Sequence, residues 1–158
     1  MSASAVQNAA LTVLLIEDNA DDALLVDEML AEAVGVQFRT EEAGTLQAGL
    51  KRLQEGEIDL VLLDLSLPDS FGLPTLAKLR DAFPAVPVVI MTGLAEESLG
   101  LEAVRCGAQD YLPKGHLSTP LMTRTLRYAI ERHQSQQELR RREEHLRLLT
   151  DQLPALFW

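Results

Sequence analysis

The sequence has a single cysteine, few aromatic residues and no long apolar run. Cys106 alone cannot form a disulfide framework or a cysteine-based metal cluster, so we expect a small buried residue late in a helix. No stretch predicts a transmembrane helix. Residues 1–10 lack the basic start and apolar core of a secretory signal, so we expect a disordered leader of a cytoplasmic protein that does not bind membranes.

Basic residues are scarce in most of the chain. Residues 1–116 carry 7 Lys or Arg against 19 Asp or Glu, a net charge of −12, whereas residues 117–158 carry 7 against 5, a net charge of +2. An acidic body has no basic stripe that could displace the counterions of a phosphate backbone. The composition therefore argues against direct binding of nucleic acid.

Short apolar runs alternate with patterns of helical period. The expected strands are residues 13–16, 36–42, 58–63, 86–91 and a short one around Tyr111. Five such alternations predict a parallel sheet covered by helices on both faces. The fold class is therefore expected to be α/β, a doubly wound five-stranded parallel sheet of the flavodoxin-like type in the order 2-1-3-4-5.

The helices between these strands are predicted from caps and apolar spacing. The first should begin at Asp21 or Asp22 and end near residue 33. Its expected buried face is Leu24, Leu25, Met29 and Leu30. The second should run from Thr45 to about Gly56, the third should carry Leu76, Leu79 and Phe83, and the fourth should carry Leu99, Ala103 and Val104 and end at Gly107. Residues 67–72, rich in proline and glycine, are expected to form a loop.

Polar residues end four of these apolar runs. They are Glu17-Asp18, Asp64, Thr92 and Lys114. The carboxyl ends of parallel strands meet at one sheet edge, where ligands bind in such folds. Clustered carboxylates repel one another unless a cation such as Mg²⁺ neutralises them, and a hydroxyl and an ammonium supply what a transferred phosphoryl group needs. The set predicts an aspartyl-phosphate site.

Residues 11–133 resemble the receiver domain of bacterial two-component response regulators. The resemblance rests on four segments in family order and spacing, residues 15–19, 63–68, 91–93 and 110–114. It implies that a sensor histidine kinase or phosphotransfer protein donates a phosphoryl group to Asp64. It also implies a domain that signals, with only self-catalysed phosphotransfer and dephosphorylation as its chemistry.

The resemblance assigns a role to each site residue. Asp18 would bind Mg²⁺ directly and Glu17 largely through water, with Asp64 and the backbone carbonyl of Ser66 completing the protein ligands. Thr92 would move towards the phosphate and Lys114 would pair with a phosphate oxygen. Tyr111 would be the aromatic switch that turns inward with Thr92. One departure is that Gly115, rather than proline, follows Lys114, so we expect a trans peptide bond there.

Two other readings of these residues remain open. The first is a degenerate receiver that acts as a phosphorylation-independent platform for interaction or dimerisation. The second is a Mg²⁺-dependent phosphatase with an aspartate nucleophile. Such enzymes generally carry a second acid two residues after the nucleophile, and Ser66 occupies that position.

The last part of the chain predicts a long helix. Thr119 should cap it, with Pro120 at its first position, and no glycine or proline follows until Pro154. Residues 134–153 would form a helical linker beyond the receiver. Its apolar positions suggest a heptad seam interrupted by Arg142, and therefore a parallel coiled-coil homodimer, with a solvated single helix as the alternative. The seam positions are Leu139, Leu146, Leu149 and Leu153.

The sequence closes on an apolar and aromatic run. Residues 154–158 are expected to be the start of a truncated output domain, because such side chains normally belong in a core. Residues 148–154 weakly resemble the entry to a PAS sensor domain. In receivers continued by such a helix, PAS modules followed by a diguanylate cyclase or histidine kinase are the usual outputs.

Overall fold

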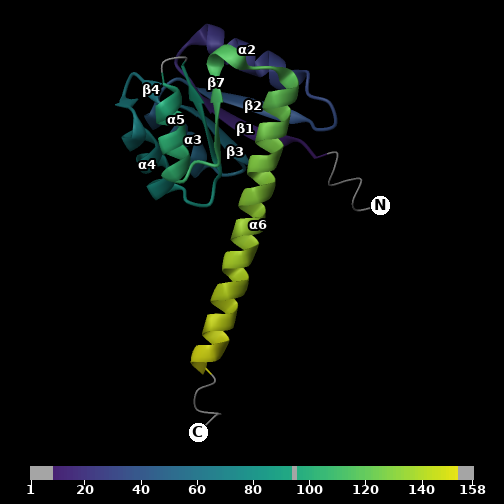
Figure 1. Cartoon of the computed structure of the whole chain (residues 1–158), viewed down its shortest axis with the longest axis vertical. Helices are drawn as coiled ribbons and strands as arrows, with labels where there is room; N and C mark the ends of the chain where they lie inside the picture. Colours follow the sequence, from purple (N-terminus) through teal and green to yellow (C-terminus); the bar gives the residue numbers. More distant parts are fainter. Residues whose placement is uncertain (1–8, 94–95, 153–158) are drawn as a thin grey trace.

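The computed structural model describes residues 9–93 and 96–152, which form an α/β body with one projecting helix (Figure 1). The central sheet has five parallel strands in the order β2-β1-β3-β6-β7. They are β1 (Leu11–Ile16), β2 (Phe38–Ala43), β3 (Leu60–Asp64), β6 (Val88–Thr92) and β7 (Asp110–Pro113). Because β4 and β5 belong to a separate small sheet, β6 and β7 are the fourth and fifth strands of this one. The predicted doubly wound sheet with the order 2-1-3-4-5 is therefore confirmed.

Helices cover both faces of this sheet (Figure 1). One face carries α3 (Leu46–Gln54), α4 (Leu73–Ala82) and α5 (Glu97–Arg105), and the other carries α2 (Ala20–Ala31) and α6 (Thr119–Gln152). Successive strand residues point to opposite faces, so Leu14 joins the first core and Leu15 the second. Because both faces are covered, the inner strands β1, β3 and β6 are almost entirely apolar, whereas the edge strand β2 carries Arg39, Glu41 and Glu42.

The start of α2 differs from the prediction. Asn19 is its cap, since the Asn19 Oδ1 atom accepts hydrogen bonds from the backbone amides of Asp21 and Asp22 at 2.9 and 3.0 Å. Neither aspartate is therefore the cap. This arrangement leaves both aspartate side chains available for contacts outside the helix.

The buried face of α2 is also different. Leu24 and Leu25 are 56% and 41% exposed, so the prediction that they are buried is wrong. The buried residues are Ala23, Val26 and Leu30. These three follow the helical period, whereas adjacent leucines diverge by about 100° around the axis and cannot share a narrow stripe.

Three further local predictions are corrected. Residues 67–72 are not an irregular loop, because β4 (Ser66–Leu67) and β5 (Ser70–Phe71) form a small antiparallel hairpin. Phe83 lies just beyond α4, where the backbone φ of −136° has left the helix. Cys106 follows the end of α5 and is exposed rather than buried.

The long last helix is present and extends beyond the body (Figure 1). Its cap is Ser118 rather than Thr119, because the Ser118 hydroxyl accepts a hydrogen bond from the Leu121 amide at 3.2 Å. The part of α6 that packs on the sheet buries Met122, Leu126, Ala129 and Ile130. Residues 1–8 and 153–158 lie outside the described part of the chain, and with them most of the predicted leader and the predicted start of an output domain. None of the described helices has the length and apolarity needed to span a bilayer.

Candidate functional site

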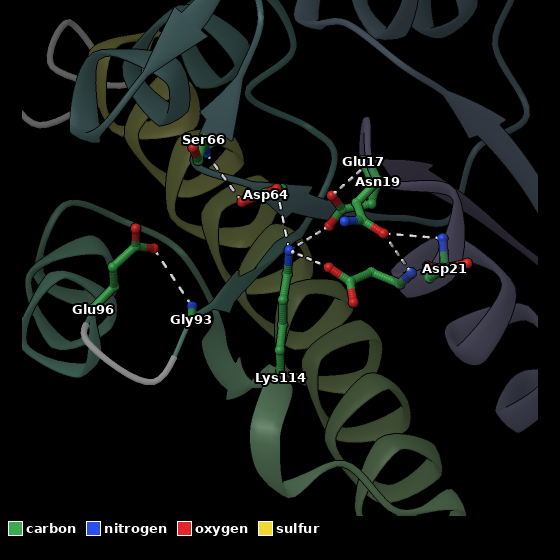
Figure 2. A network of polar contacts seen from close by, with 9 residues as sticks. Glu17, Asn19, Asp21, Asp64, Ser66, Gly93, Glu96 and Lys114 are labelled. Atoms are coloured by element: carbon green, nitrogen blue, oxygen red, sulfur yellow. Dashed lines mark hydrogen bonds and ion pairs between the residues drawn. The ribbon is translucent and has the colours of Figure 1, made fainter.

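Glu17, Asp64 and Lys114 come together at one edge of the sheet (Figure 2). Glu17 and Asp18 follow β1, Asp64 ends β3, and Thr92 ends β6. Lys114 follows β7 and reaches back across the same edge. The residues are brought together because the strands that they end are parallel and adjacent in the sheet.

Three carboxylates form a compact cluster. Glu17, Asp18 and Asp64 each offer an oxygen atom, and these atoms all lie within 4.8 Å of one another. The side chains of Glu17 and Asp64 are buried, whereas Asp18 is exposed. The cluster is therefore closed towards the core and open to solvent on the side of Asp18.

Lys114 is the cation inside this cluster. Its Nζ atom lies 2.7 Å from Glu17 Oε2, 3.1 Å from Asp22 Oδ2 and 3.2 Å from Asp64 Oδ2. One ammonium group thus contacts three carboxylates that would otherwise repel one another. The local charge is still negative, which leaves the site attractive to a further cation.

The electrostatics of this group are set by burial and by ion pairs. Burial raises the pKa of the Glu17 carboxyl to about 7, opposed by the Lys114 ammonium and assisted by the Asp64 carboxyl. Burial alone would lower the pKa of the Lys114 amine, but its pairs with Glu17, Asp64 and Asp22 outweigh that effect and raise it. Lys114 therefore stays protonated at neutral pH, whereas Glu17 changes protonation near neutrality.

The backbone at Ser66 lies directly beside the Asp64 carboxylate. The Ser66 amide donates a hydrogen bond to Asp64 Oδ1 at 3.0 Å (Figure 2). Asp64 Oδ2 is the oxygen that contacts Lys114. Both carboxylate oxygens are therefore oriented by the protein, one by a backbone amide and the other by an ammonium group.

Thr92 and Tyr111 lie on the other side of the site. Thr92 is fully buried, and its Oγ1 atom has no hydrogen-bond partner among residues 9–93 and 96–152. Tyr111 is half-buried, and its ring lies against Gly100, where a Cβ atom would come within 2.7 Å of the ring and 3.1 Å of Thr92 Cγ2. The two side chains thus share one packing region on α5.

Sequence reasoning missed two residues of this site. The sequence predicts a helix cap at Asp22, but this residue is an ion-pair partner of Lys114. The second is Asn19, whose side chain caps α2 and whose backbone N–H donates a hydrogen bond to Glu17 Oε1 at 3.1 Å. The available signal is position along the chain, because Asp22 lies in the first turn of the helix that directly follows Glu17 and Asp18.

The donor set suits a divalent cation that prefers oxygen ligands. Glu17, Asp18 and Asp64 supply carboxylates from two adjacent strand ends, and Mg²⁺ is usually bound by one or two carboxylates together with water. Glu17 Oε2 is a buried atom that pairs with Lys114 Nζ but accepts no well-aligned hydrogen bond from the described residues. The residues present therefore fit Mg²⁺.

The peptide bond between Lys114 and Gly115 is trans, as predicted.

Comparison with known proteins agrees with the resemblance described from the sequence motifs. A family model described as the response regulator receiver domain matches residues 13–127. The chain is 38% identical over 122 residues to the KDP operon transcriptional regulatory protein KdpE of Escherichia coli (strain K12), covering 77% of this chain and 52% of KdpE. It is 33% identical over 129 residues to the transcriptional regulatory protein BasR of the same strain, covering 80% of this chain and 55% of BasR. The chain spans about half the length of these two relatives.

Solved structures share the fold. NtrX from Brucella abortus superposes with a TM-score of 0.70 at 26% identity, covering 83% of this chain and 29% of NtrX. A yeast Spc42 trimeric coiled-coil segment fused to another structure gives a TM-score of 0.71 over 94% of this chain and 96% of that one. Its identity is 20%, so that likeness concerns the fold alone.

Proposed function

The chain belongs to the family of response regulator receiver domains, and from this premise we propose that Asp64 accepts a phosphoryl group in the presence of Mg²⁺. The donor is a phosphohistidine of a sensor histidine kinase or phosphotransfer protein. The position of Asp64 carries the proposal. Its buried carboxylate lies 3.2 Å from Lys114 Nζ and shares a 4.8 Å cluster with Glu17 and Asp18.

The transfer is a displacement at phosphorus. An oxygen atom of the Asp64 carboxylate forms the new O–P bond while the N–P bond of the phosphohistidine breaks, and the electron pair of that bond returns to the imidazole nitrogen. Asp64 is suited to this role because Ser66 and Lys114 each orient one of its oxygens. Lys114 then pairs with an oxygen of the acquired phosphate.

Glu17, Asp18, Asp64 and the carbonyl of Ser66 would hold Mg²⁺. When bound, the ion neutralises charge that develops on the phosphoryl oxygens. Support comes from the oxygen chemistry of the donor set and from its net negative charge around Lys114. Lys114 must share Glu17 with the incoming cation, so the ion and the ammonium compete for one carboxylate.

Thr92 and Tyr111 would respond to the phosphate. The Thr92 hydroxyl has no described hydrogen-bond partner, so a phosphate oxygen on Asp64 offers it one. Tyr111 packs beside Thr92 over Gly100, and a movement of Thr92 therefore changes the space that the ring occupies. This pair couples the phosphate to the surface of α5 and β7 as a two-state element.

We assign residues 11–133 to the receiver and residues 134–153 to a helical linker that relays the change to an output domain. Four leucines of the linker are exposed, Leu139, Leu146, Leu148 and Leu149. Three of them, Leu139, Leu146 and Leu149, follow one another with Ser135 and Arg142 at spacings of four and three residues, the pattern of a coiled-coil seam. A second copy of α6 is therefore the proposed partner of this face.

The experiment that tests the phosphoacceptor is intact-mass spectrometry after incubation with acetyl phosphate and Mg²⁺. The wild type is expected to gain one phosphoryl group and an Asp64→Asn variant none, and chelation of Mg²⁺ is expected to abolish the gain. An unmodified wild type that also binds no Mg²⁺ would instead identify a degenerate receiver acting as an interaction platform.

A further inference from the structure

The turn between β4 and β5 is bound to a distant helix by one side chain. Asp69 Oδ1 accepts a hydrogen bond from the Leu46 amide at 2.9 Å, and Asp69 Oδ2 accepts one from the Gln47 amide at 3.0 Å. These are the first two amides of α3, which has no acidic residue of its own in its first turn. A carboxylate that accepts two amides at a helix N-terminus is held by charge-assisted bonds and by the helix dipole.

Thr45 completes this helix terminus with a hydrogen bond inside α3. Its hydroxyl accepts a hydrogen bond from the Ala48 amide at 3.0 Å, and the Gly49 amide begins the regular helical bonds. Thr45 and Asp69 therefore satisfy the amides that α3 leaves free at its start. The two residues stabilise the same helix end, and among the side-chain hydrogen bonds of residues 9–93 and 96–152 it is Asp69 that connects this end to another part of the chain.

The hairpin is very small, and its buried anchor is Leu67, so the Asp69 bonds add a second attachment at the turn. Its strands are two residues each, pairing Ser66 with Phe71 and Leu67 with Ser70, and isolated hairpins of this kind are marginal in water. Phe71 is 68% exposed and contributes little burial. On the side of α4, the hydroxyls of Ser70 and Thr75 share a hydrogen bond of 2.7 Å. On the side of α3, Asp69 makes the bonds.

The first strand of this hairpin begins beside the phosphoacceptor. Ser66 is two residues after Asp64, its amide bonds to the Asp64 carboxylate, and its carbonyl is a proposed Mg²⁺ ligand. We propose that Asp69 is a positioning residue of the Asp64 site, which ties the hairpin to α3 and thereby fixes the Ser66 backbone for metal binding. This inference rests on the proposed function. The same two amides hold the pKa of the Asp69 carboxyl below its usual range, as a bound carboxylate requires.

The test compares two ways of removing a cap from α3. Asp69→Ala removes the tether together with two cap bonds, whereas Thr45→Ala removes a cap bond and leaves the tether in place. Mn²⁺ serves as the probe, with free Mn²⁺ measured by its electron paramagnetic resonance signal. Asp69→Ala is expected to weaken Mn²⁺ binding about tenfold, as loss of a group that orients a ligand usually does, and Thr45→Ala to leave it unchanged. Asp69→Asn, which keeps one acceptor oxygen, should fall between Asp69→Ala and the wild type.

Hydrogen exchange gives a second readout that does not depend on metal. The amides of Ser66 and Phe71 should exchange faster in Asp69→Ala and at the wild-type rate in Thr45→Ala. Equal Mn²⁺ affinity in Asp69→Ala and the wild type, or an equal loss in both variants, would overturn the positioning role. A wild type that neither binds Mn²⁺ nor accepts phosphate would overturn the proposed function itself, and the positioning role with it.

Discussion

Lys114 Nζ lies 2.7 Å from Glu17 Oε2, an atom that belongs to a fully buried side chain. The pair connects the last strand of the sheet to the first, and it places a positive charge where the proposed metal ion would also interact. Lys114 therefore has two opposing effects. It stabilises the acidic cluster in the absence of a cation, and it competes with a cation for Glu17.

Replacing Lys114 separates these effects. Lys114→Met should lower the free energy of unfolding in EDTA by about 1–3 kcal/mol, because buried carboxylates lose their partner. Mg²⁺ should then raise the stability of this variant more than that of the wild type, because binding to the folded state alone stabilises it. Urea unfolding with and without Mg²⁺ measures both effects. Lys51→Met, at an exposed position of α3, is the control, and an equal response to Mg²⁺ in Lys114→Met and the wild type would contradict competition.

The contact between Gly100 and Tyr111 predicts a steric effect. A Cβ atom at Gly100 would lie 2.7 Å from the Tyr111 ring, so Gly100→Ala should displace the ring and cost about 1–3 kcal/mol of stability. In a background with Tyr128→Phe and Trp158→Phe, which leaves Tyr111 as the fluorophore, quenching of tyrosine fluorescence by iodide measures the displacement, and urea unfolding measures the cost. Gly44→Ala is the control, because a Cβ atom at Gly44 meets nothing within 4 Å. In a Tyr111→Ala background, Gly100→Ala should cost much less, and full additivity would argue against the contact.

The fold could be predicted from the sequence because strand and helix periods alternate without ambiguity. The carboxyl ends of buried parallel strands also predict that Asp64, Thr92 and Lys114 lie at one edge of the sheet. The predictions that proved wrong concern local features, such as the face that a helix buries. Leu24 and Leu25 are adjacent and exposed, and apolarity alone did not reveal the phase of the narrow stripe that α2 buries.

Long-range contacts of short polar side chains were the other limit. Asp69 bonds to amides 22 and 23 residues earlier in the chain, and Asp22 reaches Lys114 across 92 residues. An aspartate near the start of a helix has the same local signal whether it caps that helix or contacts another element. Only the assembled sheet edge distinguishes the two cases.

The Asp69 tether should also give a pH-dependent contribution to stability. The pKa of its carboxyl is lowered in the folded state by the Gln47 and Leu46 amides, so the stabilisation is present above the ordinary value of 3.8 and is lost as the pH falls through the lowered value. At neutral pH, Asp69→Asn should therefore be less stable than the wild type by about 1 kcal/mol, the typical worth of a helix cap. Urea unfolding at neutral and at strongly acidic pH should show this difference shrinking on acidification, and a constant difference would contradict the account.

The linker makes a geometric prediction about self-association. In a Cys106→Ser background, Ser135→Cys places a thiol on the proposed seam, four residues before Leu139. A parallel dimer in register brings the two thiols together, so oxidation should give a disulfide-linked dimer on a non-reducing gel. Gln134→Cys, which lies one residue off the seam, is the matched control. Equal cross-linking of the two variants, or a monomeric mass by light scattering at micromolar concentration, would argue against pairing through this face.

The most direct test of the central claim is to identify the residue that carries the phosphate. After phosphorylation with acetyl phosphate and Mg²⁺, borohydride reduces an acyl phosphate to an alcohol, and peptide mass spectrometry then locates the converted side chain. The account predicts conversion of Asp64 to homoserine, dependent on Mg²⁺, with Asp18 and Asp22 unchanged. Conversion at another carboxylate, or phosphorylation of the Asp64→Asn variant to the wild-type extent, would contradict it.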